Sequence, residues 1–556
     1  MNKSSKHIGE TTPQKIKDAI WSSGKSWLYV CLILLFVVFI RARLLDVPLE
    51  RDEGEYAYMG QMLLQGIPPY SEAYTMKLPG TSLMYAGIIS LFGQTIRGIH
   101  LGFMLLNLAT ILLIFLLSRK LVNDFVAVIA SASYAVLSLS SSVYGFAAHA
   151  THFVVLPAVG GALLLLSAVE NKKLPVYWLS GCLFGLAFIM KQSGFLFVLF
   201  GASYLYHDWR SKPERASKQL WSSLSLFSGG AALPLLAVAL WLYAAGVFDK
   251  FWFWTFKYAA AYSSQIPISA AFAVFWINFL DIADGFLLLW IAAALGFLAA
   301  FFHAALNNTR AFIGYFTLFS FLSICPGFYF RPHYFITLLP AISLLIGIFF
   351  YYVAAKSTKL VRSPRAWIMG LGIFLSLLAV GIAGQTNNLF RESPASVSRS
   401  AYGLNPFPES LEIAKFIEAR TNKDDRVAVF GSEPQIFFYS HRLSATGHIY
   451  MYGLMEHHDY ALPMQKEMIR EVESSNPKFV VLAAVPMSWL VRQNSEKYIL
   501  DWLNNFIQRN YRLVGAADIV SAEKTIYRWY RDAETYVVKS PYHMLIFERK
   551  NGSVQH

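Results

Sequence analysis

Long apolar segments recur over the first two thirds of the chain, separated by short polar stretches. A helix needs roughly 20 apolar residues to cross a bilayer. By this criterion eleven segments can be drawn as spans, near residues 27–40, 99–118, 125–142, 150–168, 176–190, 194–206, 219–245, 285–303, 311–327, 333–354 and 366–384. The pattern predicts a polytopic α-helical membrane protein with about 11 spans.

Beyond the last span, polar and charged positions return to normal frequency. Short apolar runs at 426–431 and 478–484 are typical of buried strands. Helical patterns lie between or after them, near 409–421, 462–474 and 497–508. Because strands that alternate with helices favour a small α/β layer, we expect residues 386–556 to form a soluble α/β domain.

Composition supports a membrane protein and excludes several other classes. Hydrophobic residues make up 56% of the 556 residues and charged residues only 15%, too little polar surface for the three or four soluble domains that this length would otherwise suggest. The cysteines, Cys31, Cys182 and Cys325, all lie in or beside apolar segments, so we expect no disulfide framework.

Basic residues predict the orientation of the chain. Lysines in the first 26 residues indicate a cytoplasmic tail at 1–26, and every predicted inner loop carries Lys or Arg, for example Arg119 and Lys120. An odd number of spans then puts the C-terminal domain outside, after a transmembrane domain at 27–385. These loops account for the net charge of +13, so we expect membrane lipids and no nucleic acid as partners.

The predicted external loop 42–97 is long and polar. Its stretch from Asp52 to Gly66 has Tyr56, Met59 and Leu63 on one helical face, which is typical of a helix lying on the membrane surface. A second interfacial helix is expected over 81–92, whose apolar run is short for a span.

Charged residues in this loop have two interpretations. Asp52 and Glu53 come just after the first span, and Lys77 opens the second interfacial helix. Acids often offset the dipole of a helix at its first turn, and an interfacial lysine often extends toward water. Taken singly, each residue is ordinary, but their combination favours a site.

The motifs of this loop and of later segments belong to one pattern. They are Asp52-Glu53, Gly66-Ile-Pro-Pro-Tyr70, Met76-Lys77-Leu78-Pro79, Lys191-Gln192, Arg331-Pro-His-Tyr-Phe335 and Val429-Phe-Gly-Ser-Glu-Pro-Gln-Ile-Phe-Phe-Tyr439. With them and its overall layout, the chain resembles the membrane glycosyltransferases of the GT-C class. More narrowly, it is similar to the family-39 group of protein O-mannosyltransferases and the aminoarabinose transferase that modifies lipid A.

The resemblance implies a function and roles for residues. It implies transfer of a sugar from a polyprenyl-phosphate donor to a lipid, glycan or protein hydroxyl, with inversion, at the outer face of a bacterial plasma membrane. Asp52 matches the family's catalytic acid, while Glu53 would orient it; Lys77 matches the phosphate-binding lysine. Further expected phosphate contacts are Arg331, His333 and Lys191, and further substrate contacts are Tyr56 and Tyr70. Neither a cofactor nor a metal ion is expected.

The chain departs from the family at one place. Many relatives carry a second acidic residue at the outer end of the fourth span, where this chain reads Ala147-Ala-His-Ala-Thr-His152. His149 or His152 would stand in its place, and either is neutral near pH 7 unless its pKa is raised. A buried polar residue facing the helix bundle is the simpler explanation of His152.

Two other patterns have structural explanations. The spacing of Glu456-His-His-Asp459 does not suit a zinc site, although contact with donor or acceptor from the external domain stays open. The aromatic run Phe251-Trp-Phe-Trp254 is typical of an interfacial anchor, which we favour over a platform that stacks sugars.

The alternative function is a non-catalytic transporter or flippase of lipid-linked glycans. A transporter is expected to carry broken helices or charges at mid-membrane. Asp281 and Asp284 are predicted at the outer edge. The external acid and lysine therefore favour an enzyme, while the sugar and the acceptor stay open.

Overall fold

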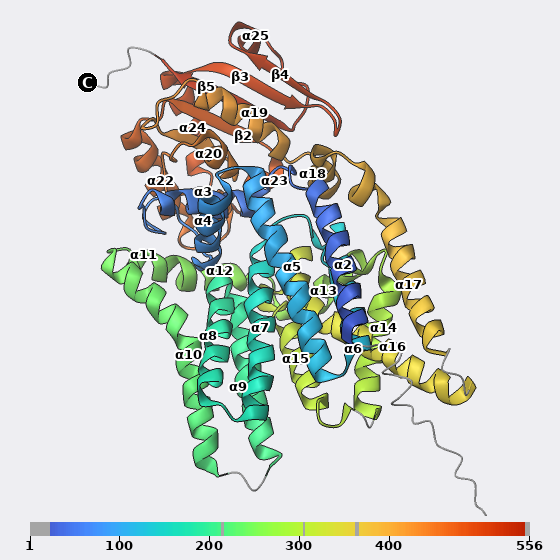
Figure 1. Cartoon of the computed structure of the whole chain (residues 1–556). Coiled ribbons are helices and arrows are strands. Elements are labelled where there is room, and N and C mark those ends of the chain that lie inside the picture. Colours follow the sequence, from blue (N-terminus) through green and yellow to red (C-terminus); the bar gives the residue numbers. More distant parts are fainter. Residues whose placement is uncertain (1–22, 213–215, 304–305, 362–365, 551–556) are drawn as a thin grey trace, which may run out of the picture.

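The computed structural model describes residues 23–212, 216–303, 306–361 and 366–550. Most of the predicted tail 1–26 lies outside the described residues. Figure 1 shows long helices running side by side below, a mixed sheet above them, and two short helices, α3 and α4, between these two layers.

Each of the eleven predicted spans overlaps a helix. These helices are α2 (Ser23–Arg43), α5 (Ile96–Leu121), α6 (Asp124–Leu137), α7 (Ala150–Asn171), α8 (Leu174–Met190), α9 (Phe195–Arg210), α10 (Ser217–Ala244), α14 (Leu287–Phe302), α15 (Arg310–Leu322), α16 (Leu339–Val361) and α17 (Ala366–Gly384). Within the described residues, five helices are long and apolar enough to cross a membrane by themselves: α2, α5, α7, α10 and α16. Several others are apolar but shorter, such as α8 and α14.

The segment between α10 and α14 is helical, although the sequence pattern left it as an external loop. It contains α11 (Phe248–Trp252), a π-helical turn (Phe253–Tyr258), α12 (Ala259–Ser263) and α13 (Ile268–Ala283). The two halves, Phe248–Ser263 and Ile268–Ala283, meet at 87° and together are long and apolar enough for a broken span or a re-entrant loop. Counting this pair raises the number of spans in the described residues to as many as six.

The two helices expected in the first external loop are present as α3 (Arg51–Leu64) and α4 (Gly80–Phe92). The side chains of α3 are buried on nearly all sides, from Arg51 to Met62. It therefore does not lie open on the membrane surface as expected, because α4 and a helix of the C-terminal domain, α20 (Gln435–Ser440), cover it.

The C-terminal domain is built on one mixed sheet. Its strands are β1 (Val427–Phe430), β2 (Phe479–Ala484), β3 (Tyr511–Ile519), β4 (Thr525–Trp529) and β5 (His543–Arg549), in the order β1-β2-β5-β3-β4. The two strands expected from sequence, β1 and β2, pair in parallel, and the other neighbours pair antiparallel. The three expected helices are present as α19 (Phe407–Glu418), α22 (Ala461–Ser475) and α24 (Tyr498–Asn510).

Shorter elements connect these parts. They are 3-10 turns at Ser141–Val143, Gln192–Gly194, Pro326–Phe328 and Pro332–Thr337, a π-helical turn at Asn387–Arg391, and the helices α18 (Pro394–Tyr402), α21 (Tyr452–Met455), α23 (Pro486–Trp489) and α25 (Arg531–Glu534). The turns at 192–194 and 332–337 directly follow Lys191 and Arg331, so both basic residues stand at helix boundaries.

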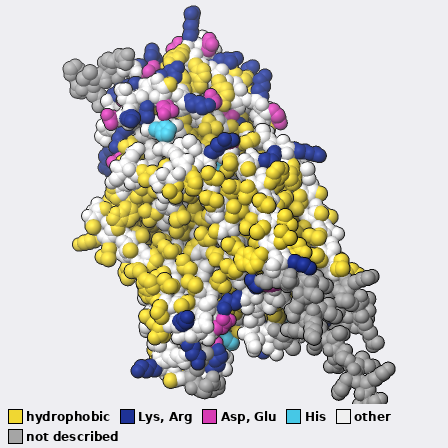
Figure 2. Space-filling model, viewed as in Figure 1, with side chains coloured by type: hydrophobic (Ala, Val, Ile, Leu, Met, Phe, Trp, Pro, Cys, Tyr) yellow, Lys and Arg dark blue, Asp and Glu magenta, His cyan; other side chains and the backbone are white. Residues whose placement is uncertain are grey.

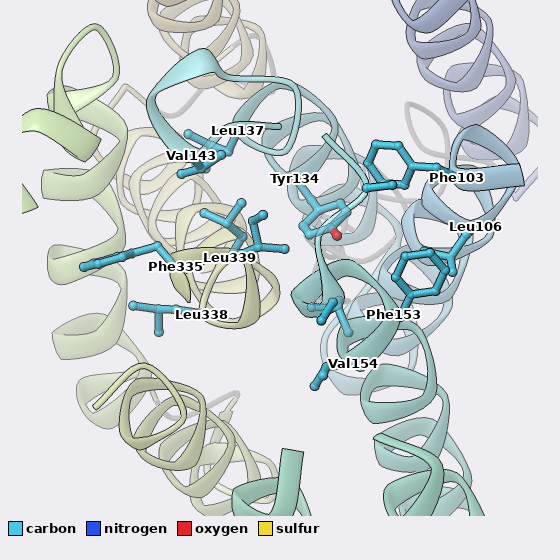
Figure 3. Packing of buried hydrophobic residues seen from close by; sticks show 14 of the residues in the cluster. Phe103, Leu106, Tyr134, Leu137, Val143, Phe153, Val154, Phe335, Leu338 and Leu339 are labelled. Atoms are coloured by element: carbon cyan, nitrogen blue, oxygen red, sulfur yellow. The ribbon is translucent and has the colours of Figure 1, made fainter. Parts of the chain in front are cut away.

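Apolar packing joins the membrane helices below α3. Figure 3 shows Phe103, Leu106 and Phe153 on one side and Phe335, Leu338 and Leu339 on the other, with Tyr134 between them. All of these side chains are at most 7% exposed. Figure 2 shows hydrophobic side chains in a broad band around the middle of the molecule, with Lys and Arg beyond both edges of the band. This surface fits a multi-pass membrane protein.

Candidate active site

An ion-paired lysine is the centre of the site. Lys77 Nζ lies 2.6 Å from Asp52 Oδ1 and 2.6 Å from Glu55 Oε2. Glu55 also accepts a hydrogen bond from the Thr75 hydroxyl, and Asp52 Oδ1 accepts one from the Tyr450 hydroxyl at 3.2 Å. The sequence had placed Asp52 and Lys77 on one loop; the structure brings them into contact and adds Glu55.

The start of α3 fixes the direction of Asp52. Glu50 caps the helix, because its carboxylate accepts from the backbone N–H of Glu53 at 2.9 Å. Glu53 returns the contact by accepting from the Glu50 N–H, and it also accepts from the Ala148 N–H at 2.6 Å. Its carboxylate lies 3.0 Å from His100 Nε2. Glu53 therefore points away from Lys77 and ties α3 to the membrane helices.

The C-terminal domain holds the other side of α3. Arg51 makes an ion pair with Glu433 at 2.5 Å and donates to the Ser432 carbonyl at 2.8 Å. Glu433 comes from the Val429–Tyr439 motif and is fully buried. A Cβ at Gly54 would lie 2.7 Å from the backbone N of Gln435, so only glycine permits this approach of α20 to α3.

Charge and burial set the protonation of this cluster. Burial would raise the pKa of Asp52, but the ammonium of Lys77 holds that pKa well below its ordinary range. Burial would lower the pKa of Lys77, and the carboxylates of Asp52 and Glu55 keep it well above its usual value. For Glu55, burial prevails over the attraction of Lys77 and raises the pKa. The pair Asp52–Lys77 is thus ionised near neutral pH.

A cavity of about 320 Å³ opens beside this pair. It brings together residues that are far apart in sequence: Asp52, Lys77, His149, Lys191, Arg331 and His333. The ammonium of Lys191 lies 3.6 Å from the centre of the Tyr334 ring, and burial lowers its pKa to about 7. Arg331 donates to the Tyr262 hydroxyl at 2.9 Å. Lys77 and Arg331 are cationic and Lys191 is partly so near pH 7, so three basic side chains face one space, which suits an anion.

Part of the remaining wall of this cavity is apolar. It includes Met190, Phe256, Ala259, Ala260 and Pro326. A cavity with cations at one end and apolar side chains along its wall matches a ligand with a charged head and a hydrocarbon tail.

Three side chains in the cavity meet the geometric condition for a metal site. Ligand atoms of Asp52, His149 and His333 lie within 4.8 Å of one another, and the two imidazoles stack at 4.2 Å between ring centres. Burial lowers the pKa of His149 to about 4, so it is neutral and able to coordinate. A divalent ion there would, however, meet the ammonium of Lys77, which already contacts Asp52.

Of the other predicted contact residues, some line the cavity and some are buried behind it. Tyr56 lines the cavity, and Lys77 Nζ lies 4.5 Å from the centre of its ring. Tyr70 is fully buried and donates to the Lys77 carbonyl at 2.7 Å, which shapes the loop. His152 is buried in α7 against Phe103, at 4.6 Å between ring centres. Of the two histidines at the position of the missing acid, His149 is the one that lines the cavity.

Several residues of the site were missed in the sequence. Glu55 stands three residues after Asp52, and this helical spacing is the signal that could have found it. The interfacial-anchor interpretation of 251–254 is wrong for Phe251 and Trp254, which are 2% and 7% exposed and pack against the 70–74 loop. Trp252 alone among these three is exposed as that interpretation expects.

Comparisons with known proteins agree with this architecture. The family model for dolichyl-phosphate-mannose-protein mannosyltransferases matches residues 76–241, which include Lys77 and Lys191 but not Asp52. No curated protein matches the chain in sequence.

Solved structures match the fold over nearly the whole chain. ArnT from Cupriavidus metallidurans bound to undecaprenyl phosphate is 16% identical, with a TM-score of 0.55, and the match covers 95% of this chain and 98% of that one. The oligosaccharyltransferase of Archaeoglobus fulgidus in its apo form is 13% identical with a TM-score of 0.54, covering 92% and 75%. AglB from the same organism, in complex with an inhibitory peptide and a dolichol-phosphate, is 13% identical with a TM-score of 0.51, and the match covers 91% of this chain and 74% of that one.

At these identities the structural matches show a shared fold. The chain therefore has a GT-C-like fold, and the family-model match over residues 76–241 agrees with the resemblance found in the sequence.

Proposed function

We propose that the chain transfers a sugar from a polyprenyl-phosphate donor to a hydroxyl acceptor on a lipid, glycan or protein, with inversion at the anomeric carbon. The observation that carries this proposal is the contact of Asp52 with Lys77 on the wall of a cavity that also gathers Lys191 and Arg331. A carboxylate that can take a proton thus lies beside cations that can hold a phosphate.

The proposed reaction is a single displacement. Asp52 takes the proton of the acceptor hydroxyl as its oxygen attacks the anomeric carbon. The bond from that carbon to the phosphate oxygen breaks, and the electron pair leaves with the lipid phosphate. Lys77 stabilises the charge that develops there, assisted by Lys191 and Arg331. One displacement inverts the configuration of the sugar.

Donor binding also prepares the base. While Lys77 is paired with Asp52 and Glu55, it keeps the pKa of Asp52 low. A phosphate that draws the ammonium toward itself weakens this contact, so the pKa of Asp52 rises toward its ordinary value. The carboxylate then becomes a better proton acceptor when a donor is present.

Two observations support a polyprenyl-phosphate sugar as the class of donor. The structures of ArnT and AglB that share this fold were solved with undecaprenyl phosphate and with a dolichol-phosphate, respectively. Both ligands combine a phosphate with an isoprenoid chain, and the cavity of this chain combines cations with an apolar wall. A polyprenyl-phosphate sugar fits that combination.

We also propose the location and orientation of the protein: a bacterial plasma membrane, with a cytoplasmic tail at 1–26, a membrane domain at 27–385 and an external domain at 386–556. Basic residues in the predicted inner loops support it. A reporter fused after Gly384 should be active only outside the cytoplasm. Activity inside instead would contradict this orientation.

A second candidate is the transport of lipid-linked glycans. The bend of 87° between Phe248–Ser263 and Ile268–Ala283 favours it, because transporters build their sites from broken helices. Tyr262 and Ser263, beside the bend, line the cavity. A transporter, however, has no use for a carboxylate held as a base.

Comparison of a deletion strain with its complemented strains tests the proposal. Lipid-linked sugars and envelope glycans are analysed by mass spectrometry. The deletion should accumulate a polyprenyl-phosphate sugar and lose one sugar from an envelope acceptor, and the wild-type gene should restore both. The Asp52→Asn gene, expressed to the same level, should restore neither.

The outcome separates the two candidates. Loss of the envelope sugar without restoration by wild type would exclude this gene as its cause. Full restoration by Asp52→Asn would favour transport, because a transporter does not need the base.

A further inference from the structure

A second cavity also borders the Asp52–Lys77 pair. Asp52, Lys77, Tyr262 and Arg331 line both cavities, so the pair forms part of a shared wall. Lys191 and His333 line only the first cavity, whereas the C-terminal domain contributes to the second. The two spaces differ in chemistry, although they meet at the same carboxylate.

Aromatic side chains dominate the second cavity, which we name the aromatic chamber. Its rings are Tyr74, Trp254, Tyr258, Tyr262, Tyr450 and Tyr452. Tyr74 and Trp254 stack at 5.5 Å between ring centres, and Trp254 packs edge-on against Tyr258 at 5.1 Å. Such rings offer flat faces to the C–H groups of a sugar and hydroxyls to its oxygens.

One carboxylate stands in this aromatic wall. Glu456 lines the chamber, is 5% exposed, and accepts a hydrogen bond from the Tyr258 hydroxyl at 2.8 Å through Oε2. Aromatic packing alone explains the buried rings, but a carboxylate is costly at such a place unless it has hydrogen-bond donors. Neighbouring hydroxyls of a sugar are donors of the right kind and spacing for a carboxylate.

The geometry of displacement assigns the chamber to one substrate. The attacking oxygen and the leaving oxygen stand on opposite sides of the anomeric carbon in a single displacement. Under the proposed function the lipid phosphate leaves beside Lys77 and Lys191, on the side of the first cavity. The chamber reaches Asp52 without Lys191 or His333, so it is the space that remains for the acceptor.

We infer that the acceptor is a saccharide, whose sugar ring lies in the aromatic chamber with a hydroxyl at Asp52 and a neighbouring hydroxyl bound by Glu456. This inference rests on the proposed function and makes it specific, because that function leaves lipid, glycan and protein acceptors open. Glu456 is an acceptor-binding residue, and the sequence motif 456–459 gains a role in recognition rather than in metal binding.

The first experiment identifies the acceptor class. The full-length protein in lipid nanodiscs receives radiolabelled lipid-linked sugars extracted from the deletion strain. Three acceptor pools from the same strain are offered separately: glycan-bearing envelope material, delipidated protein stripped of glycans, and lipids free of sugar. Label should enter the glycan pool alone.

The outcomes separate a failure of the saccharide acceptor from a failure of the proposed transferase function. Label in the protein pool or the lipid pool alone would overturn the saccharide acceptor and leave the transferase proposal standing. A donor that is consumed in none of the pools, nor by water, would overturn both.

The second experiment tests Glu456 with the labelled glycan pool. Glu456→Gln should raise the KM for acceptor about tenfold or more, since it removes a charged hydrogen bond. The KM for donor and the slow hydrolysis of donor by water should stay within about twofold. The matched control is Glu496→Gln, at an exposed position of the same domain.

A protein that has lost its fold would lose donor hydrolysis too, so this readout separates binding from folding. Glu456→Asp, which keeps the charge, should recover part of the acceptor affinity. An unchanged acceptor KM in Glu456→Gln, or a rise in donor KM instead, would overturn the assignment of the chamber.

Discussion

Replacement of Asp52 by asparagine changes charge at the centre of the site with little change of shape. Asp52 receives hydrogen bonds from Lys77 at 2.6 Å and from the Tyr450 hydroxyl at 3.2 Å. An asparagine oxygen can accept the same bonds, but it cannot take a proton from a hydroxyl. Lys77 would still pair with Glu55 at 2.6 Å, so the ammonium does not lose its last partner.

These contacts give two expected changes of opposite sign. Transfer should fall by about 100-fold or more because general-base assistance is lost, which corresponds to about 2.7 kcal/mol of barrier. Donor affinity should stay equal or rise up to about tenfold, because one of the two carboxylates that compete with the phosphate for Lys77 has lost its charge. A misfolded variant would lose both activities together.

The assay uses purified protein in nanodiscs. Transfer is followed with labelled donor at saturating acceptor, and donor binding by displacement with undecaprenyl phosphate. Thermal unfolding checks the fold. Asp46→Asn is the matched control, because Asp46 is exposed in the same loop, 42–97, and pairs with Arg97; it should leave all three measurements unchanged.

Transfer by Asp52→Asn at close to the wild-type rate would refute the reasoning. His149, whose Nδ1 lies 4.0 Å from Asp52 Oδ2, would then be the next base to test. Donor binding lost together with transfer would show instead that Asp52 holds Lys77 in place rather than competing for it.

Four further predictions follow from the same contacts. Lys77→Ala should weaken binding of undecaprenyl phosphate and slow transfer, whereas Lys77→Arg should retain part of both; normal binding in Lys77→Ala would remove this lysine from the site. Because burial lowers the pKa of Lys191 to about 7, the charged form is lost as pH rises through 7, so donor affinity should fall between pH 6 and pH 8. Lys191→Arg should bind donor equally at both pH values. If the donor affinity of this variant still falls between pH 6 and pH 8, another group is responsible for the titration. Transfer should continue in a chelator, since cationic side chains supply the charge; activity lost there and restored by a divalent ion would assign a metal to the site. Glu433→Gln should lower the free energy of unfolding by about 3 kcal/mol, because it leaves the buried charge of Arg51 without its counterion, and a thermal midpoint equal to that of wild type would contradict this.

Sequence periodicity was sufficient for the eleven helices that overlap predicted spans and for part of the site, but it missed the helices between α10 and α14. Apolar segments predicted α2, α5 and the other long helices, since length and hydropathy are local properties. The motifs also named the residues that meet at the first cavity, from Asp52 and Lys77 to Lys191 and Arg331. Their meeting could be predicted because all of them were expected at the same depth of the membrane.

Contacts between distant layers could not be read from the sequence. Phe251 and Trp254 have the composition of a membrane belt, and only the three-dimensional structure shows that protein covers them. Glu55 stayed hidden because it has no motif of its own, and its contact with Lys77, 22 residues later in the same loop, is seen only in the three-dimensional structure. Strands β3, β4 and β5 pair antiparallel beyond the two expected strands. Their sequences, YRLVGAADI, TIYRW and HMLIFER, mix polar and charged residues with apolar ones and are not apolar from end to end, as β1 and β2 are.

The position of α3 between the membrane helices and the C-terminal domain means that its contacts form late in synthesis. Arg51 meets Glu433 across 382 residues of chain, and Asp52 meets Tyr450 across 398. A ribosome that adds about 5–20 residues per second needs on the order of 20 to 80 seconds to make that interval. During this time the membrane helices are already being inserted, while Asp52 still lacks its contact with Tyr450 of the C-terminal domain. Under the proposed function, the chain therefore stays inactive during its own synthesis, and a product truncated before the last domain should not consume lipid-linked sugar.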